Sequence, residues 1–589
     1  MVPPVFPIPR ALEPRPGTFG PDDPVREEAD TALPGQGYEL DLAPGGGRLA
    51  YADAAGLRHG RATLAQLRRA SPQGVPAQRI RDWPDFPVRG YMLDISRDRV
   101  PTRATLGHLV RRMERLRLNH LQLYTEHTFA YPGHELVWGH ASPLTADDVA
   151  WLDGLCTRHG IELAANQNLF GHMERWLRHE PYRHLAETPE GWQTSFGQRM
   201  PASVLRPCDE SLEFALSLID VLAPLFSSRR INIGCDETFE LGRGASRERV
   251  NQVGLGRVYL DHLQRLLAGL RERGREPLFW GDVVRNHPEL ARELPADAVG
   301  LAWHYEAPLD PDLLPEFLLT AVGEFGITRE SLRCFEPHVR PFVTAEQPFW
   351  VCPGTSSWNT LTGRLDNALG NLMDATATGR AHGAGGLLIT DWGDNGHHQP
   401  YAVSLPPLVF GAALGWCAAT NSGIENDLAA VVDALAFEAP DAGLGEALVR
   451  LGLLHGRTGL TRFNGSPIHS ALMPGPLVTA WGESDASTLG RLVSEIDATV
   501  AQIEGARPGA QDGDTIRGEL TAAARLARHG VWRLARHKGL PAPSAAALAA
   551  DLREAAAMQR AAWLSSSRPG GLAESMARIE HALAEYDAT

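Results

Sequence analysis

Between residue 89 and about residue 420, short apolar runs alternate with amphipathic segments of helical length. Each run is rich in aliphatic and aromatic residues, which is typical of strands buried on both faces of a parallel sheet. The segment after the first run places its apolar side chains on one helical face, as a helix covering such a strand requires: Leu106, Leu109, Val110, Met113 and Leu116. The runs number eight: 89–96, 119–125, 161–168, 230–237, 277–282, 298–306, 348–354 and 385–394.

Eight successive strand–helix units predict an α/β fold of the (β/α)8 TIM-barrel type over residues 86–420. An open doubly wound sheet is the alternative, but no Gly-x-Gly-x-x-Gly string follows the first run. Residues 1–85 are rich in Pro and Gly with short alternating runs, which predicts a small N-terminal α/β domain. Residues 421–589 have helical periodicity and predict an α-helical C-terminal domain. Within it, the unusual string WLSSSRPGG (563–571) is interpreted as the closed end of a helix.

The composition excludes several classes of protein. With 43% hydrophobic and 22% charged residues it is that of a soluble globular protein. A net charge of −15 argues against a nucleic-acid partner, which needs a basic surface. The first residues lack the apolar core of a signal peptide and no run reaches 18 apolar residues, so we expect a cytoplasmic protein without membrane contact. The six cysteines lack Cys-x-x-Cys spacing, which predicts buried thiols, with neither a metal site nor disulfides.

Catalytic groups of such barrels lie at the carboxyl ends of the strands, and here those ends are rich in carboxylates and aromatic rings. Carboxylates that end a buried strand cost desolvation energy unless they have a partner or a task. Aromatic faces suit the apolar face of a sugar. This combination predicts glycoside chemistry. The residues at or just beyond the strand ends are Asp236, Glu237, Trp280, Asp282, Trp303, Tyr305, Trp358, Trp392 and Asp394.

Three strings, in the right order, resemble the family 20 β-N-acetylhexosaminidases. They are RGYMLDISR at 89–97, FGH at 170–172 and NIGCDE at 232–237. The resemblance covers roughly residues 1–420, and the spellings GCDE and YTEHTFAYPGHE are most similar to the intracellular hexosaminidase D-like branch.

The resemblance implies an exo-acting, retaining enzyme that removes terminal β-linked N-acetylhexosamine without a cofactor. The acetamide of the substrate would be the nucleophile. Glu237 would be the general acid/base, Asp236 would accept the acetamide N–H, and Glu126 with His172 would form a relay behind them. Adjacent strand residues face opposite ways, so both carboxylates can serve one substrate only where the strand ends and the backbone turns. The implied substrate-binding residues are Arg89, Trp280, Asp282, Trp303, Tyr305, Trp358, Trp392 and Asp394.

Three other readings stay open at this point. In an ordinary retaining glycosidase, Asp282 or Asp394 would attack while Glu237 acts as the acid. A metal-dependent hydrolase would use His397 and His398 with Asp391 or Asp394, although neither a His-x-His on the first strand nor a His-Glu-x-x-His string supports it. A sugar-binding protein without catalysis would have little use for the Asp-Glu pair. No motif distinguishes a preference for N-acetylglucosamine from one for N-acetylgalactosamine. The oligomeric state has no motif either, and a homodimer is one candidate.

Overall fold

The computed structural model describes residues 3–97, 99–194, 197–323, 326–474 and 480–587. Its centre is a closed barrel of parallel strands, which confirms the predicted fold class. Each strand pairs with the next along the chain, and β15 closes the ring against β6. The strands are β6 Val88–Asp94, β7 His120–Tyr124, β8 Glu162–Asn166, β11 Arg230–Asn232, β12 Glu276–Trp280, β13 Val299–Trp303, β14 Phe349–Cys352 and β15 Gly386–Asp391.

Large apolar side chains fill the barrel interior, because every second residue of a strand points inward. Met92, Leu278, Leu301 and Leu388 form this core together with tryptophans from the strand ends. The opposite face of each strand packs against the surrounding helices. These are α2 Arg103–Arg115, α4 Ala146–Arg158, α7 Asp209–Leu222, α9 Leu255–Glu272, α13 Glu336–Ala345, α14 Leu365–Ala381 and α15 Leu405–Asn421.

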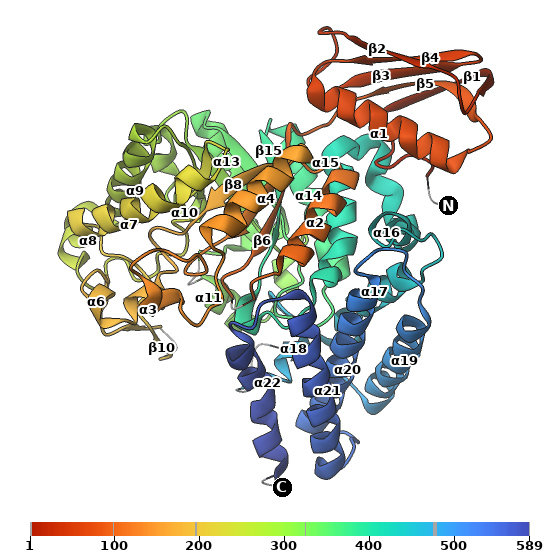
Figure 1. Ribbon diagram of the computed structural model, residues 1–589. Helices are drawn as coiled ribbons and strands as arrows, with labels where there is room; N and C mark the ends of the chain where they lie inside the picture. Colours follow the sequence, from red (N-terminus) through yellow and green to blue (C-terminus); the bar gives the residue numbers. More distant parts are fainter. Residues whose placement is uncertain (1–2, 98, 195–196, 324–325, 475–479, 588–589) are drawn as a thin grey trace.

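The N-terminal region is a five-stranded sheet covered on one face by a single helix. Leu40, Leu49 and Leu67 form its core, to which Trp416 of α15 adds a side chain from the barrel. This core therefore joins the small domain to one end of the barrel, as Figure 1 shows. Its elements are β1 Ala11–Phe19, β2 Val25–Ala29, β3 Tyr38–Ala43, β4 Gly46–Tyr51, α1 Ala54–Ala70 and β5 Val75–Asp82.

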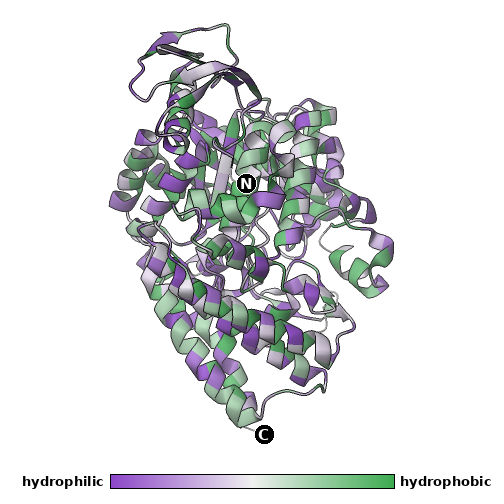
Figure 2. Cartoon of the chain, turned by 90° about the vertical axis from the view of Figure 1, so that its right-hand side faces the viewer, coloured by the Kyte–Doolittle hydropathy of each residue, from purple (hydrophilic) through white to green (hydrophobic). Residues whose placement is uncertain are grey.

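The C-terminal region is mainly helical, and α18 and α20–α22 lie at the other end of the barrel, away from the small domain, whereas α16 lies beside the barrel and closer to that domain (Figure 1). Hydrophilic and hydrophobic residues alternate along these helices in Figure 2, as the helical periodicity predicts. A short sheet of β16 Leu460–Arg462 and β17 Ala480–Gly482 is an element that the periodicity did not predict. The helices are α16 Leu428–Ala436, α17 Leu444–Gly452, α18 Pro467–Ser470, α19 Ala486–Gly505, α20 Gly513–His537, α21 Ala545–Ser566 and α22 Leu572–Asp587.

Two expectations need correction. Residues 401–436 form one helical stretch that contains an 18-residue window with a mean hydropathy of 1.6, long and apolar enough by composition to cross a membrane. The expectation that no run reaches this length was wrong, but 89% of the apolar window is buried inside the protein. A helix packed on all sides is apolar all round, which explains the composition. All six cysteines are free; four are buried, whereas Cys208 and Cys334 are half-buried.

Candidate active site

A backbone turn after β11 brings Asp236 and Glu237 to the same place. The strand ends at Asn232, and Gly234, Cys235 and Glu237 then adopt left-handed conformations with φ of 67°, 71° and 50°. Non-glycine residues in this region are strained, and such strain gathers at functional sites. The turn reverses the alternation of the strand, so both carboxylates can face the carboxyl end of the barrel. The strand-end turn expected for this pair is therefore present.

The neighbouring backbone fits tightly against this turn. A Cβ atom on Gly171 would lie 2.2 Å from the Asp236 carbonyl oxygen, so only glycine allows the approach. The Tyr259 hydroxyl donates to the Cys235 carbonyl at 2.9 Å and fixes the turn from behind.

Asp236 is 5% exposed and surrounded by hydrogen-bond donors. Asn168 Nδ2 donates to its Oδ1 at 3.0 Å, and His172 Nε2 lies 3.4 Å from its Oδ2. Burial would raise the pKa of Asp236, but the charge of His172 and these hydrogen bonds outweigh it and hold the pKa below the ordinary value. Asp236 is therefore a carboxylate at neutral pH.

Glu237 has the opposite electrostatic character. Its side chain keeps 38% of its surface exposed, as a group that must reach a substrate needs, with Oε2 3.5 Å from His172 Nε2. Burial among protein groups raises its pKa, and the negative charges of Asp236 and Asp394 raise it further against the opposing effect of His172. Glu237 therefore keeps its proton to a higher pH than an ordinary glutamate, whereas Asp236 loses its proton at a lower pH than an ordinary aspartate. This division suits one carboxyl for proton transfer and the other for charge stabilisation.

His172 links the two carboxylates to Glu126. Its own φ is 52°, and its Nδ1 lies 3.9 Å from Glu126 Oε1. Burial disfavours its charge, yet Asp236 and Glu237 outweigh burial and raise the pKa of His172 to about 9. Glu126 accepts the Tyr124 hydroxyl at 2.9 Å, and burial raises its pKa. The structure thus brings together the four residues predicted as catalytic.

Arg89 does not lie in this site, so the expectation that it holds sugar hydroxyls is wrong. It is the second residue of β6, at the amino end of the barrel, where its guanidinium donates to Gln36 Oε1 and the Phe86 carbonyl. Arg97 occupies the site instead. Its Nη1 lies 3.2 Å from Asp94 Oδ2 and 3.3 Å from Glu126 Oε1.

Three site residues were missed by the sequence analysis: Arg97, Tyr124 and Asn168. Each lies at or just beyond the end of one of the first three strands, so strand-end position was the signal that could have found them.

The predicted aromatic residues form one connected cluster at the mouth of the barrel. Trp392 lies 5.8 Å from Trp280 and 6.4 Å from Tyr305, measured between ring centroids. Tyr305 stacks on Trp303 at 5.1 Å and meets Trp358 edge-on at 5.0 Å. The buried Nε1 atoms of Trp280 and Trp303 have no partner among the described residues. Such a cluster offers apolar walls with polar edges, which is how sugar sites are built.

The two remaining aspartates lie beside the pair. Asp282 Oδ2 accepts the Glu237 backbone N–H at 3.1 Å, and burial together with Asp236 raises its pKa to about 7. Asp394 approaches Asn359 Nδ2 at 3.5 Å, and burial raises its pKa as well.

No group of three His, Cys, Asp or Glu side chains is placed to hold a metal ion within the described parts of the chain. His398, named in the metal reading, instead contacts His469 Nε2 at 3.1 Å and the Ser575 carbonyl at 3.0 Å.

Two family models match the chain. "Glycosyl hydrolase family 20, domain 2" matches residues 21–83, and "Glycosyl hydrolase family 20, catalytic domain" matches residues 86–310. Among curated proteins, the chain is 25% identical over 306 residues to Hexosaminidase D of Homo sapiens, covering 50% of this chain and 57% of the relative. It is 28% identical over 201 residues to the Bos taurus protein of that name, covering 33% and 56%. The matches span little more than half the length of these relatives.

Solved structures share the fold. The Flavobacterium johnsoniae chitobiase aligns with a TM-score of 0.59 at 12% identity, over 94% of this chain and 96% of that chain. An exo-β-N-acetylglucosaminidase from Vibrio harveyi in complex with N-acetylglucosamine aligns with a TM-score of 0.52 at 15% identity, over 73% and 78%.

Proposed function

The chain belongs to glycoside hydrolase family 20, and from this premise we propose that it is an exo-acting β-N-acetylhexosaminidase. It removes terminal, non-reducing β-linked N-acetylglucosamine or N-acetylgalactosamine with retention of configuration. The observation that carries the proposal is the Asp236–Glu237 pair, whose adjacent carboxyl groups have pKa values shifted in opposite directions. The names of the relatives, which are hexosaminidases, support the substrate class.

In the first step the acetamide oxygen of the substrate attacks the anomeric carbon as the bond to the aglycone breaks. Glu237 gives its proton to the leaving oxygen, which is the task of a carboxyl with a raised pKa. Asp236 accepts the acetamide N–H, so that the oxygen is aimed at the anomeric carbon. Its negative charge balances the positive charge of the oxazolinium that forms.

In the second step water attacks the same carbon and the acetamide oxygen leaves it. Glu237, now ionised, takes a proton from that water and regains its starting state. Two inversions at one carbon give a product with the original β configuration. Every proton released in this cycle is returned, so the chemistry needs neither a metal nor a cofactor.

His172 and Glu126 stabilise the charge state of the pair. Because its pKa is about 9, His172 is an imidazolium at neutral pH and keeps Asp236 ionised from 3.4 Å away. Arg97 lies beside Glu126 and over the rings of Tyr124 and Trp392, where those of its donors that have no partner among the described residues can bind sugar hydroxyls. Trp280, Trp303 and Trp358 supply the walls around the acetamide and the ring.

The ordinary retaining mechanism with a carboxylate nucleophile is less well supported. One oxygen of Asp282 is engaged by the Glu237 backbone, and a pKa of about 7 leaves Asp282 partly protonated at neutral pH. A protonated carboxyl is no nucleophile. Asp394 also has a raised pKa, because burial penalises its charge.

We place the enzyme in the cytoplasm, in keeping with the six free thiols, since such thiols persist in a reducing compartment. This assignment is independent of the chemistry proposed above.

The test is a comparison of 4-nitrophenyl β-glycosides of N-acetylglucosamine, N-acetylgalactosamine and glucose. We expect hydrolysis of the acetamido sugars and very slow hydrolysis of the glucoside, because glucose carries no acetamide. Proton NMR should show the β anomer as the first product. A glucoside cleaved as fast as the N-acetylglucosaminide would overturn the proposal.

A further inference from the structure

The string WLSSSRPGG, which we call the latch segment (563–571), does more than end a helix. It runs from the end of α21 along the loop between β6 and α2, whose described residues, 95–97 and 99–102, are here called the arginine loop. Ser566 O accepts the Thr102 N–H at 2.9 Å, and the Arg568 N–H donates to Val100 O at 2.8 Å. Pro101 and Ser567 form a bridge of the kind found between antiparallel strands. The backbone of the C-terminal region is thus hydrogen-bonded to a loop of the barrel.

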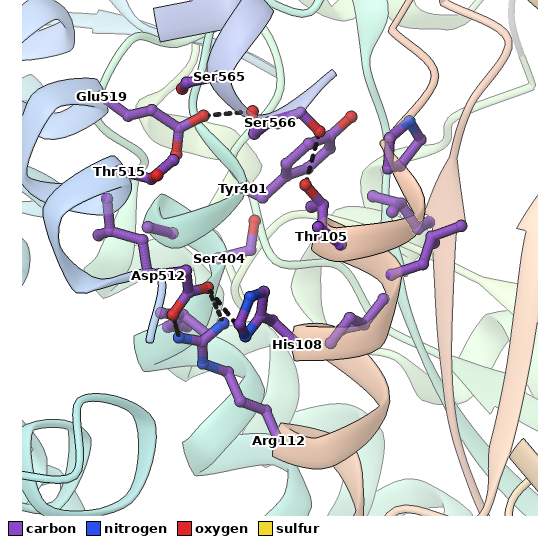
Figure 3. Close-up of a pocket in the computed structure, with 18 of the residues that line it drawn as sticks. Thr105, His108, Arg112, Tyr401, Ser404, Asp512, Thr515, Glu519, Ser565 and Ser566 are labelled. Carbon is purple, nitrogen blue, oxygen red and sulfur yellow. Dashed lines mark hydrogen bonds and ion pairs between the residues drawn. The ribbon is translucent and has the colours of Figure 1, made fainter. Parts of the chain in front are cut away.

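Arg99, in the middle of the arginine loop, is the centre of this contact. Its guanidinium is 1% exposed and all three of its nitrogens are bound. Nε donates to Ser567 Oγ at 2.9 Å, while Nη2 donates to Ser566 Oγ and to Glu519 Oε1 of α20, both at 3.1 Å. Figure 3 shows two further hydrogen bonds of Ser566: its hydroxyl donates to Glu519 Oε1, and its carbonyl accepts the Thr105 hydroxyl of α2 at 2.6 Å. A buried arginine with a single carboxylate partner needs all of these bonds to stay in place.

The third nitrogen of Arg99 is connected to the active site through Gln399. Nη1 donates to the Gln399 carbonyl at 2.7 Å, and Gln399 Nε2 donates to the Trp392 carbonyl at 2.9 Å. Trp392 is part of the aromatic cluster. Arg99 is therefore connected by two successive hydrogen bonds, through Gln399, to the backbone of a residue that lines the site.

The arginine loop also carries Arg97, two residues before Arg99. Its guanidinium lies 4.8 Å from the Tyr124 ring and 5.1 Å from the Trp392 ring. At the start of the arginine loop, the Arg97 backbone N–H donates to Asp94 Oδ1 at 3.1 Å. At its end, the latch segment is hydrogen-bonded to the backbone of Val100 and Thr102. We therefore expect these two attachments to set the position of Arg97.

We propose that Arg99 is a positioning residue, through which the latch segment and Glu519 set the places of Arg97 and Trp392 in the active site. The C-terminal helices thereby complete the site without supplying a residue that touches the substrate. This inference rests on the proposed function, and it extends to a region in which the sequence indicated no chemistry.

The experiment is a double-mutant cycle on kcat/KM with 4-nitrophenyl N-acetyl-β-glucosaminide. Arg99→Gln should lower kcat/KM by about 10–10²-fold, since a misplacement of about 1 Å in a site costs up to about 10²-fold. In an Arg97→Ala background the same change should cost clearly less than in the wild type, because Arg97 is no longer there to be misplaced and only the effect through Trp392 remains. Arg99→Lys, which keeps the charge but not the fork of donors, should restore only part of the loss.

A matched control is available in the pocket drawn in Figure 3, which is lined by Glu519 and Ser566 as well as by Arg112 and Asp512. Asp512 binds Arg112 through two hydrogen bonds of 2.6 and 2.7 Å, joining α2 to the residue before α20 (Figure 3). Asp512→Asn breaks an ion pair of the same kind, but it touches neither the arginine loop nor Gln399. We expect it to lower the melting temperature while kcat/KM stays unchanged.

Three outcomes would overturn the inference: additive effects of the Arg99 and Arg97 changes, equal losses of kcat/KM in Arg99→Gln and Asp512→Asn, or no loss in either. If Arg99→Gln does not fold, Ser567→Ala takes its place in the cycle; it removes the bond to Arg99 Nε together with one bond to the Tyr401 hydroxyl, and it leaves the Arg99 side chain in place. Hydrogen exchange gives a readout that is independent of turnover, with faster exchange expected at residues 95–97 and 392–399 in the Arg99 variant only. A wild-type protein inactive on every glycoside would count against the proposed function, whereas unchanged exchange would count against the latch.

Discussion

Each end of the barrel holds two arginines, of which only Arg97 is half-buried and the other three are buried, and the two pairs have different neighbours. At the amino end, Arg89 and Arg117 join the barrel to the small domain, with Asp82 3.0 Å from Arg117. At the carboxyl end, Arg97 and Arg99 join the barrel to the active site and to the C-terminal helices. Burial and the neighbouring charge of Arg117 lower the pKa of Arg89 to about 9. From this comparison we predict that the arginines at the amino end serve stability, whereas those at the carboxyl end serve the chemistry proposed for the active site.

The largest effect expected at the carboxyl end is that of Glu237→Gln. Protonation of the leaving oxygen contributes about 10²–10⁴-fold, so turnover of an unactivated disaccharide should fall by that factor. A 4-nitrophenyl substrate should suffer less, because its leaving group needs less protonation. Steady-state rates on both substrates provide the check, and near-normal rates on the disaccharide would assign the acid elsewhere.

Asp236→Asn should be the next most severe change. The amide brings no negative charge to balance the oxazolinium, which should cost about 10²–10³-fold in kcat. A thiazoline mimic of the oxazolinium should inhibit the wild type tightly and the variant far more weakly. Equal inhibition constants for the two proteins would remove the role given to Asp236.

The comparison of the two ends is tested directly by Arg97→Gln and Arg89→Gln. Arg97→Gln should lower kcat/KM by about 10–10²-fold, the equivalent of charged hydrogen bonds of about 1.5–3 kcal/mol, with little change in stability. Arg89→Gln should instead lower the free energy of unfolding by on the order of 1–3 kcal/mol and leave kcat/KM unchanged. Urea unfolding and initial rates, measured on both proteins, separate the two predictions, and a reversed result would return Arg89 to the site.

The smallest effect concerns the pH profile. Glu237 must be protonated to act as the acid, so kcat/KM should fall as the pH rises through its raised pKa. Asp394 raises that pKa, and Asp394→Asn should therefore move the basic limb of the profile to lower pH by less than about one unit. Asp82→Asn, at the amino end, should destabilise the protein without moving the limb. A limb that stays in place in Asp394→Asn would mean that the two carboxylates do not interact.

The sequence predicted most of the fold because barrel strands are short apolar runs with a clear period. It also predicted the turn at Asp236 and Glu237, since two carboxylates serving one substrate require it. Arg89 was misassigned because the string RGYMLDISR has an arginine at each end. The two lie eight residues apart, roughly 26 Å along an extended chain, and only the strand's direction tells which one reaches the site.

Other features depended on contacts that no local pattern encodes. Arg99 and Ser567 lie 468 residues apart in the chain, and nothing near either of them indicates the other. The apolar character of residues 401–436 was underestimated for a related reason, because burial on all sides is decided by what packs around a helix.

The latch segment limits where the protein can be truncated. A break near residue 420 would separate two pieces that each look like a domain, yet the first would lose the partners of Arg99 and the backbone that flanks the arginine loop. A catalytic barrel transplanted into a fusion protein therefore has to bring residues 563–571 and Glu519 with it. For the same reason, insertions that change the spacing between α21 and α22 are expected to be tolerated less well than insertions in the exposed turns of the small domain.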